Sequence, residues 1–274
     1  MDNPIFDAIR NGDIFEVERL LEGGNSTLKD KTKGDEDTPL LRACFCGHID
    51  MVNWLLDKGS DINETNYYGA SVLFQAVAGG KNRMLEYLIN KHGRSLQEKS
   101  KNLATLLNEA AYYGNISTME YLVNRNASLN ETNIYGTDSL SIAASQGQLK
   151  AVKWLVEEKN CDVKYKNLEL VNVIGHAALG DHSHVLEYLL RVDDSFENVN
   201  NCDKDGDTPL LLSAYKCSNF NCIELLLSHG ADINHVNNDG ESFMIVLQNR
   251  NLEEEFRARR KSKQTKRVIK ENEI

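Results

Sequence analysis

The sequence predicts an all-α solenoid in which short helix pairs stack side by side and short β-hairpin loops, here called fingers, join them. A set of helix-capping residues recurs every 33 to 36 positions along the 274-residue chain. Each of the chain's three prolines directly follows one of these caps. The apolar residues between caps have helical spacing. A helix pair repeated at this period cannot cover its own apolar face, so copies must stack on either side.

The stretch Asp37–Asn63, DTPLLRACFCGHIDMVNWLLDKGSDIN, defines the unit. Thr38 is a favourable N-cap because its hydroxyl can accept a hydrogen bond from the first turn. Pro39 suits the first helical position, where no N–H is needed. Gly47 can take the left-handed conformation that ends a helix. A second helix follows, and Gly59 ends it before an extended exit.

The cap recurs in phase at seven further positions: Asn3, Ser71, Thr105, Asp138, Asn172, Thr208 and Ser242. Three repeats depart from the unit. The third has an unusual exit around Arg94 and a polar stretch where its finger should be, and the sixth has Asp181 in place of the turn glycine. The seventh carries one extra residue at 217–221, which predicts an altered turn between its helices.

DTPLLRA and DGDTPLLLSA, with the exits DKGSDIN and SHGADIN, resemble ankyrin repeats, whose pattern is T-P-L-H-x-A at a period of about 33 residues. The resemblance covers residues 2–250, as seven full repeats and a partial terminal one. It implies an ankyrin-repeat domain over 1–250 and a charged C-terminal helix or tail over 251–274. It also implies a concave face lined by fingers and first helices. Related exit asparagines can be hydroxylated, whereas here Asn63, Asn130 and Asn234 are interpreted as residues that hydrogen-bond the turn.

The C-terminal segment is basic. We expect a helix over 253–260 and a frayed tail beyond it. The run from Arg257 to Arg267 could be a nuclear import signal or could dock on anionic lipid or RNA. We favour a solvated helix end.

Composition limits the class of protein. The formal charge is −10, and since residues 250–274 carry nine Lys/Arg against five Asp/Glu, or +4, the body carries −14. An acidic body argues against nucleic-acid binding. No apolar run is long enough for membrane insertion, and the N-terminus does not look like a secretory signal. The six cysteines form no disulfide framework. We therefore expect a cytoplasmic monomer with reduced thiols.

Two groups of side chains resemble metal ligands. Cys44, Cys46 and His48 are closely spaced, but their phase in the repeat should make them diverge. His182 and His184 lack further ligands at a metal spacing. No phosphate-binding glycine loop or nucleophile elbow is present. We expect no enzyme activity, no cofactor and no metal.

The predicted binding residues come from the fingers and from the two positions before each turn glycine. Six of the ten tyrosines fall in these slots. Tyrosine is a common anchor of protein interfaces; the alternative is that individual rings pack on their own fingers or on neighbouring repeats. We expect the acidic residues Asp35, Glu36 and Asp37 on the rim of the groove, which favours a partner with a basic or extended segment. The aromatic candidates are Phe45, Tyr67, Tyr68, Tyr112, Tyr113, Tyr135 and Tyr215.

These features predict a non-catalytic scaffold or adaptor that holds a partner protein in its concave groove. One alternative is a secreted effector of an intracellular pathogen that acts in a host cytosol. Another is an enzyme inhibitor, a regulatory subunit or an enzyme whose active groups lie in the irregular segments 91–102 or 217–221.

Overall fold

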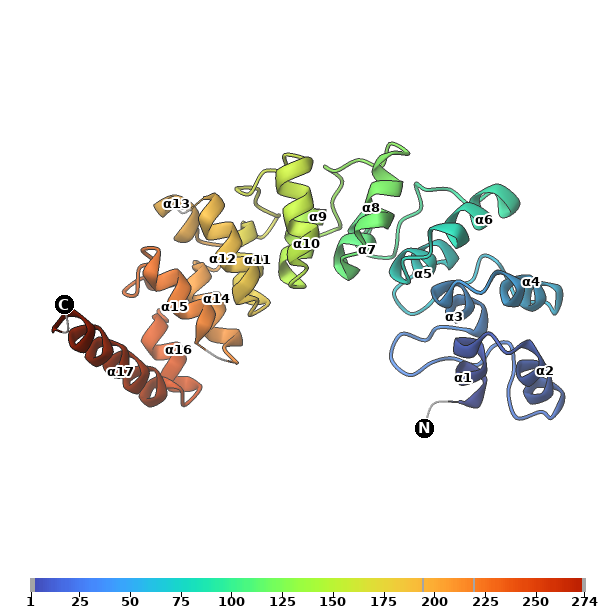
Figure 1. Cartoon of the computed structure of the whole chain (residues 1–274), viewed down its shortest axis with the longest axis horizontal. Helices are drawn as coiled ribbons and strands as arrows, with labels where there is room; N and C mark the ends of the chain where they lie inside the picture. Colours follow the sequence, from blue (N-terminus) through green and yellow to red (C-terminus); the bar gives the residue numbers. More distant parts are fainter. Residues whose placement is uncertain (1–2, 194, 219, 273–274) are drawn as a thin grey trace.

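The computed structural model describes residues 3–193, 195–218 and 220–272, without the side chains of residues 196 and 263–272. The helices form an arch with the two ends of the chain at its feet (Figure 1). The elements in order are α1 (Pro4–Asn11), α2 (Ile14–Glu22), α3 (Pro39–Cys46), α4 (Ile49–Asp57), α5 (Val72–Ala78), α6 (Asn82–His92), α7 (Leu106–Tyr113), α8 (Ile116–Val123), α9 (Ser139–Ser145), α10 (Leu149–Lys153), η1 (Trp154–Glu158, a π-helical turn), α11 (Val173–Leu179), α12 (Ser183–Val192), α13 (Phe196–Val199), α14 (Pro209–Lys216), α15 (Asn221–Ser228), α16 (Phe243–Asn249) and α17 (Glu253–Asn272).

The helices pair within repeats and stack between them, as the period predicts. Each first helix contacts the next, from α1 to α3 and onward through α5, α7, α9, α11, α14 and α16. These first helices lie toward the inside of the arch, and second helices such as α4, α6 and α12 lie toward the outside (Figure 1). One continuous apolar core runs the length of the stack. The predicted all-α repeat solenoid is confirmed.

All eight predicted caps begin a first helix. At each one the side-chain oxygen accepts a hydrogen bond from a backbone N–H of the first turn: Asn3, Thr38, Ser71, Thr105, Asp138, Asn172, Thr208 and Ser242. Proline follows at three of them, where the backbone has no donor to lose.

In three repeats the residue after the turn glycine ties its repeat to the preceding one. His48 Nε2 lies 3.1 Å from the Arg10 carbonyl, and Gln148 Nε2 donates to the Tyr112 carbonyl at 3.0 Å. Asn115 makes the corresponding bond to a carbonyl at the end of α5. These side chains satisfy carbonyl groups that a helix end leaves without partners.

The fingers are narrow turns with tips at residues 34–36, 67–69, 101–103, 134–136, 168–170, 204–206 and 238–240. Neighbouring fingers are joined by single backbone hydrogen bonds of 2.9 to 3.2 Å, such as that from Tyr67 N to Asp35 O. Within the described residues the β-structure is limited to isolated bridges at the finger bases: Lys99 with Thr105, Lys166 with Asn172, and Val236 with Ser242. The polar stretch after α6 therefore does form a finger.

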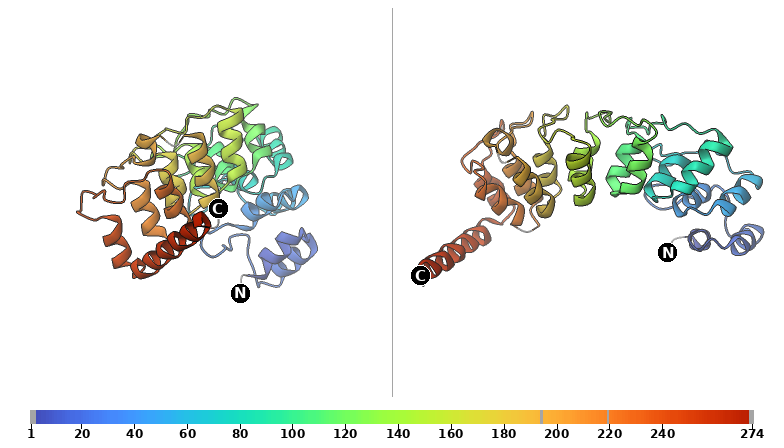
Figure 2. Two further views of the ribbon diagram at one scale, coloured as in Figure 1. Left: turned by 60° about the vertical axis from the view of Figure 1, so that its left-hand side comes forward. Right: turned by 45° about the horizontal axis from the view of Figure 1, so that its top comes forward.

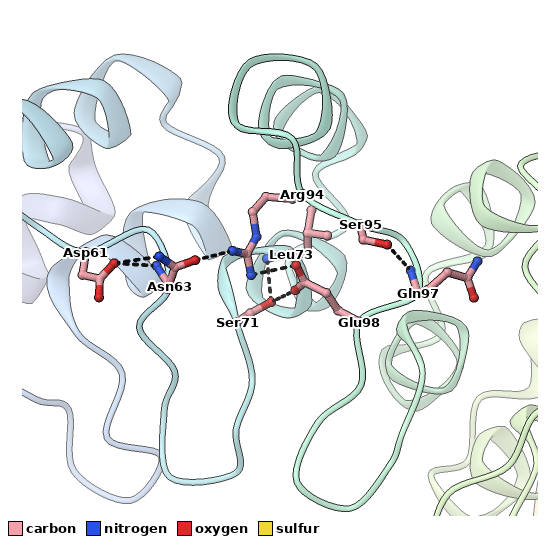
Figure 3. Close-up of polar contacts among 8 residues, drawn as sticks. All are labelled: Asp61, Asn63, Ser71, Leu73, Arg94, Ser95, Gln97 and Glu98. Carbon is pink, nitrogen blue, oxygen red and sulfur yellow. Dashed lines mark hydrogen bonds and ion pairs between the residues drawn. The ribbon is translucent and has the colours of Figure 1, made fainter.

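The unusual third exit is closed by polar contacts instead. Arg94 donates to Asn63 Oδ1 at 2.8 Å and pairs with Glu98 at 2.7 Å (Figure 3). Glu98 also accepts a hydrogen bond from the Ser71 hydroxyl at 2.5 Å. Arg94 thus links two consecutive exits, and Asn63 additionally bonds Asp61 in its own turn. The interpretation of Asn63 as a turn-bonding residue agrees with these contacts.

The other two departures also have structural consequences. Asp181 takes the left-handed conformation of the glycine it replaces, with φ 56°. In the seventh repeat, Cys217 follows α14 with an extended backbone (φ −45°, ψ 108°), so the turn predicted to be altered is altered.

The C-terminal helix is longer than predicted. It begins at Glu253 and runs to Asn272, whereas we expected it to end near Arg260. Its base is fixed by Phe256, which is buried with ring centroids 5.1 Å from Phe243 and 5.6 Å from Phe220. Beyond that base it projects away from the stack (Figure 2, right). In the described part of the chain, no helix is both long and apolar enough to cross a membrane.

Candidate functional site

A groove of about 880 Å³ runs along the inner side of the repeats. It takes its walls from the fingers, from the inner faces of α3, α5, α7, α9 and α11, and from the end of α14. The same stacking that builds the core therefore aligns residues of six repeats along one surface.

Five of the nine predicted binding residues line this groove: Asp35, Phe45, Tyr68, Tyr112 and Tyr113. They come from two fingers and two first helices, and together they span residues 35 to 113 of the sequence. Whether they contact a partner remains a prediction, but the structure brings these five together.

Tyr112 and Tyr113 end α7 and face the groove with 45% and 43% of their surfaces exposed. Their ring centroids lie 5.1 Å apart in an edge-to-face arrangement. Among the described residues, neither phenolic hydroxyl has a hydrogen-bond partner. Two adjacent rings with free hydroxyls offer apolar area together with donors for a bound molecule.

Carboxylates lie beside these rings. Burial, together with the charges of Asp35 and Asp37, raises the pKa of Glu109 to about 7. Burial and the neighbouring Glu109 carboxylate raise the pKa of the Tyr113 phenol to about 12. Both shifts have the same origin, because a site enclosed in protein disfavours negative charge and these acids repel one another.

Asp37 has a structural role, in contrast to the rim position predicted for it. Its side chain is buried, and Oδ1 accepts hydrogen bonds of 2.9 Å from Asn66 and from Gln75. Arg42 lies 3.6 Å from the other carboxylate oxygen. These contacts tie the second finger to α3 and α5 at the floor of the groove.

The remaining four predicted residues lie outside the groove lining. Tyr67 and Tyr135 are exposed on finger tips, and Glu36 pairs with Lys31 at 2.6 Å. Tyr215 packs on the finger of the following repeat, since its hydroxyl donates to Glu241 at 2.8 Å. This is the alternative that the sequence left open for individual rings.

Glu109 and His176 are groove residues that the sequence reasoning did not select. Burial lowers the pKa of His176 to about 4, so the ring is neutral at physiological pH. Its Nε2 is buried without a hydrogen-bond partner. Both residues lie four positions after a cap, at the same place in α7 and α11. A phased comparison of that position would have detected them.

The fingers also expose leucines that the sequence reasoning passed over. Leu103 and Leu170 are 51% and 46% exposed. Both have left-handed backbones, with φ 56° and 62°, at the tip position occupied by Gly69 and Gly136 in neighbouring fingers. A signal was present in the sequence, because leucine stands in these two fingers where four others have glycine and the first has Glu36.

The side chains that resemble metal ligands diverge. Cys44 is fully buried, whereas the His48 ring bonds the Arg10 carbonyl. His184 Nε2 lies 2.9 Å from the Gly147 carbonyl. The described residues contain no cluster of three or more His, Cys, Asp or Glu arranged to hold a metal ion.

A family model for ankyrin repeats (three copies) matches residues 2–66, 73–167 and 140–237, and a second for ankyrin repeats (many copies) matches 47–89. The chain belongs to the ankyrin-repeat family. The ankyrin repeat domain of human ASB11 superposes with a TM-score of 0.60 at 21% identity, covering 77% of this chain and 91% of that one. Ankyrin repeats generally mediate protein–protein interaction.

Curated ankyrin-repeat relatives include the E3 ubiquitin-protein ligase XBAT33 of Arabidopsis thaliana, 24% identical over 84% of this chain. Human transient receptor potential cation channel subfamily A member 1 is 25% identical over 85%, and human inversin is 31% identical over 53%. The chain spans only 36%, 21% and 17% of these proteins, respectively.

Proposed function

We propose that this ankyrin-repeat chain is a non-catalytic adaptor that binds an extended segment of a partner protein in its inner groove. The observation that carries the proposal is the exposure of Tyr68, Tyr112 and Tyr113 along one groove beside Phe45. Rigid aromatic side chains on a stacked scaffold lose little conformational entropy on binding.

The finger tips support the same proposal. An exposed leucine in a left-handed conformation is unfavourable for the isolated chain, since it costs about 1–2 kcal/mol in backbone energy and buries little apolar surface. Leu103 and Leu170 combine both features beside exposed Tyr67 and Tyr135. Such residues are consistent with contacts that form only when a partner is bound.

The test is selection from a displayed library of random peptides, followed by affinity measurement on the selected sequences. The Tyr112→Ala/Tyr113→Ala variant should bind them at least about tenfold more weakly, because truncating a central aromatic anchor costs about 2 kcal/mol or more. Phe15→Ala is the matched control, since Phe15 is 87% exposed on α2 and lies outside the groove lining. Equal affinity of the double variant and the wild type would contradict the proposal.

A further inference from the structure

We propose that the groove contains a subsite for a lysine or arginine side chain, formed by Glu109 on α7 with Asp35 on the first finger and the rings of Tyr112 and Tyr113. This inference rests on the proposed function and assigns a chemistry to one position of the bound segment. It also identifies Glu109, rather than the exposed acids of the rim, as the main carboxylate that pairs with the partner's basic side chain.

The Glu109 carboxylate is enclosed but uncompensated. Among the described residues it has no hydrogen bond and no ion pair. The cation placed to neutralise acids in this region, Arg42, pairs with Asp37 and stacks with its guanidinium 5.1 Å from the centroid of the Phe45 ring. Asp37 is further satisfied by its two amide donors. An ionised Glu109 beside Asp35 therefore lacks a cation that a partner can supply.

The aromatic wall is suited to the same ligand. A cation within about 6 Å of a tyrosine ring centroid is attracted to its face. Elsewhere the chain uses this contact itself, as between Arg125 and Tyr121 at 3.7 Å and between Lys101 and Tyr67 at 5.5 Å. No such internal cation is present at Tyr112 or Tyr113 within the described residues. Their faces and hydroxyls remain available next to Glu109.

A second, independent feature of the groove indicates a polar ligand. His176 is 8% exposed and lines the same groove, and its Nε2 has no hydrogen-bond partner. A buried polar atom without a partner is costly unless a bound molecule satisfies it. Because Nε2 itself is covered by protein, the neutral ring can make a hydrogen bond to the backbone of a segment extending from α7 toward α11 only after the side chain rotates toward the groove.

Charge along the groove also has a direction. Glu109 on α7 and Asp35 on the first finger lie in its N-terminal half, whereas the ammonium group of Lys216, at the end of α14, has no partner among the described residues. A segment whose basic residue reaches Glu109 complements the acidic end, and an uncharged segment leaves it unpaired.

Two measurements test the subsite. In the first, peptides selected on the wild type from a random library are sequenced and measured against Glu109→Gln, an isosteric change. A basic residue should recur at one fixed position, and Glu109→Gln should weaken binding about tenfold or more. Glu120→Gln, on the exposed outer helix α8, is the matched control and should change affinity by less than about twofold.

The second measurement uses blocked single residues as probes. N-acetyl-arginine methylamide is titrated into the ¹⁵N-labelled chain, with N-acetyl-citrulline methylamide as its uncharged counterpart. Shift changes should centre on residues 109–113, occur only with the charged probe, and be lost in Glu109→Gln.

The outcomes separate the subsite from the proposed function. Selected peptides without a recurring basic residue would overturn the subsite and leave the protein-binding groove intact. A selection that enriches no peptide would count against the proposed function, and the blocked arginine would then decide the subsite alone. Shifts that are equal for both probes, or that persist in Glu109→Gln, would overturn it.

Discussion

A Cβ atom on Gly79 would lie 2.0 Å from the carbonyl oxygen of Phe45. The first helices of the second and third repeats therefore approach each other more closely at this point than any other residue type allows. The sixth repeat has the same relationship, because a Cβ on Gly180 would lie 2.4 Å from the Ser145 carbonyl oxygen. These two glycines precede the turn residue, at a position where other repeats carry asparagine, cysteine, tyrosine or glutamine.

Gly79→Ala should lower the free energy of unfolding by about 1–3 kcal/mol, because the backbones of α3 and α5 must separate to admit the methyl group. Urea denaturation followed by circular dichroism measures the change. Gln146→Ala is the control at the same position of the fifth repeat and should have little effect. A Gly79→Ala variant as stable as the wild type would show that this close approach is not required.

Leu103→Gly should raise the free energy of unfolding by about 0.5–1 kcal/mol. It removes a left-handed leucine that costs about 1–2 kcal/mol, offset by the greater freedom of glycine in the unfolded chain. Leu170→Gly should act in the same way. Both variants should also bind selected peptides no better than the wild type if the tips contact the partner.

Leu168→Gly is the control for these changes. Leu168 lies in the same finger as Leu170 and is 59% exposed, but its backbone is not left-handed. Glycine at position 168 should lower the free energy of unfolding by about 0.5–1 kcal/mol, because it increases only the backbone entropy of the unfolded chain. The same sign for Leu168→Gly and Leu170→Gly in chemical denaturation would contradict the assignment of strain to Leu170.

The elements that could be predicted are those set by local chemistry. Thr38 caps a helix because its own hydroxyl reaches the first turn, and Gly47 ends it because glycine accepts a positive φ. Neither depends on a distant contact, so each could be identified in every repeat in which it occurs. The period then determined how the copies stack, and with it the course of the groove past Tyr112.

The parts that could not be predicted depend on contacts between repeats. Glu109 is enclosed because fingers and helices of several repeats line the groove around it, and its phase in the repeat marks its position but not this enclosure. Asp37 was predicted to lie on the rim because it is acidic. Its carboxylate is instead buried, where it accepts hydrogen bonds from the side-chain amides of two other segments. Tyr215 has the same phase as Tyr112, yet Glu241 of the following finger engages its hydroxyl.

Asn172→Ala should be the most destabilising of the cap substitutions. Asn172 is fully buried, accepts from Gly175 N at 2.8 Å and donates to Asn198 O at 2.7 Å. Alanine removes the cap and leaves the Asn198 carbonyl without this donor, which together cost about 2–4 kcal/mol. Thermal unfolding measures the loss. Ser242→Ala, which removes a 3.5 Å cap bond in the last repeat, should cost only about 0.5–1 kcal/mol, and equal losses would contradict this ranking.

Glu109→Gln should stabilise the protein at alkaline pH and not in acid. The folded chain raises the pKa of Glu109 from 4.5 to about 7, through burial and the charges of Asp35 and Asp37. An acid with a raised pKa binds its proton more tightly in the folded state. Its contribution to stability therefore declines as the pH rises from about 4.5 to about 7, and the loss is complete above that range.

Glutamine carries no charge, so the variant should avoid this loss. At pH 8 its free energy of unfolding should exceed that of the wild type by about 1–3 kcal/mol, and below pH 4.5 the two should converge. Urea denaturation from pH 4 to 8 measures the difference in the free energy of unfolding between the two proteins. The shifted pKa values of Asp37 and His176 largely cancel in this difference, because both proteins contain these residues. Exposed Glu120→Gln should show no such divergence. A variant that is more stable at pH 8 yet binds basic peptides less well would show that the half-buried carboxylate of Glu109 costs stability and serves binding. Parallel pH profiles would contradict the enclosed charge at Glu109.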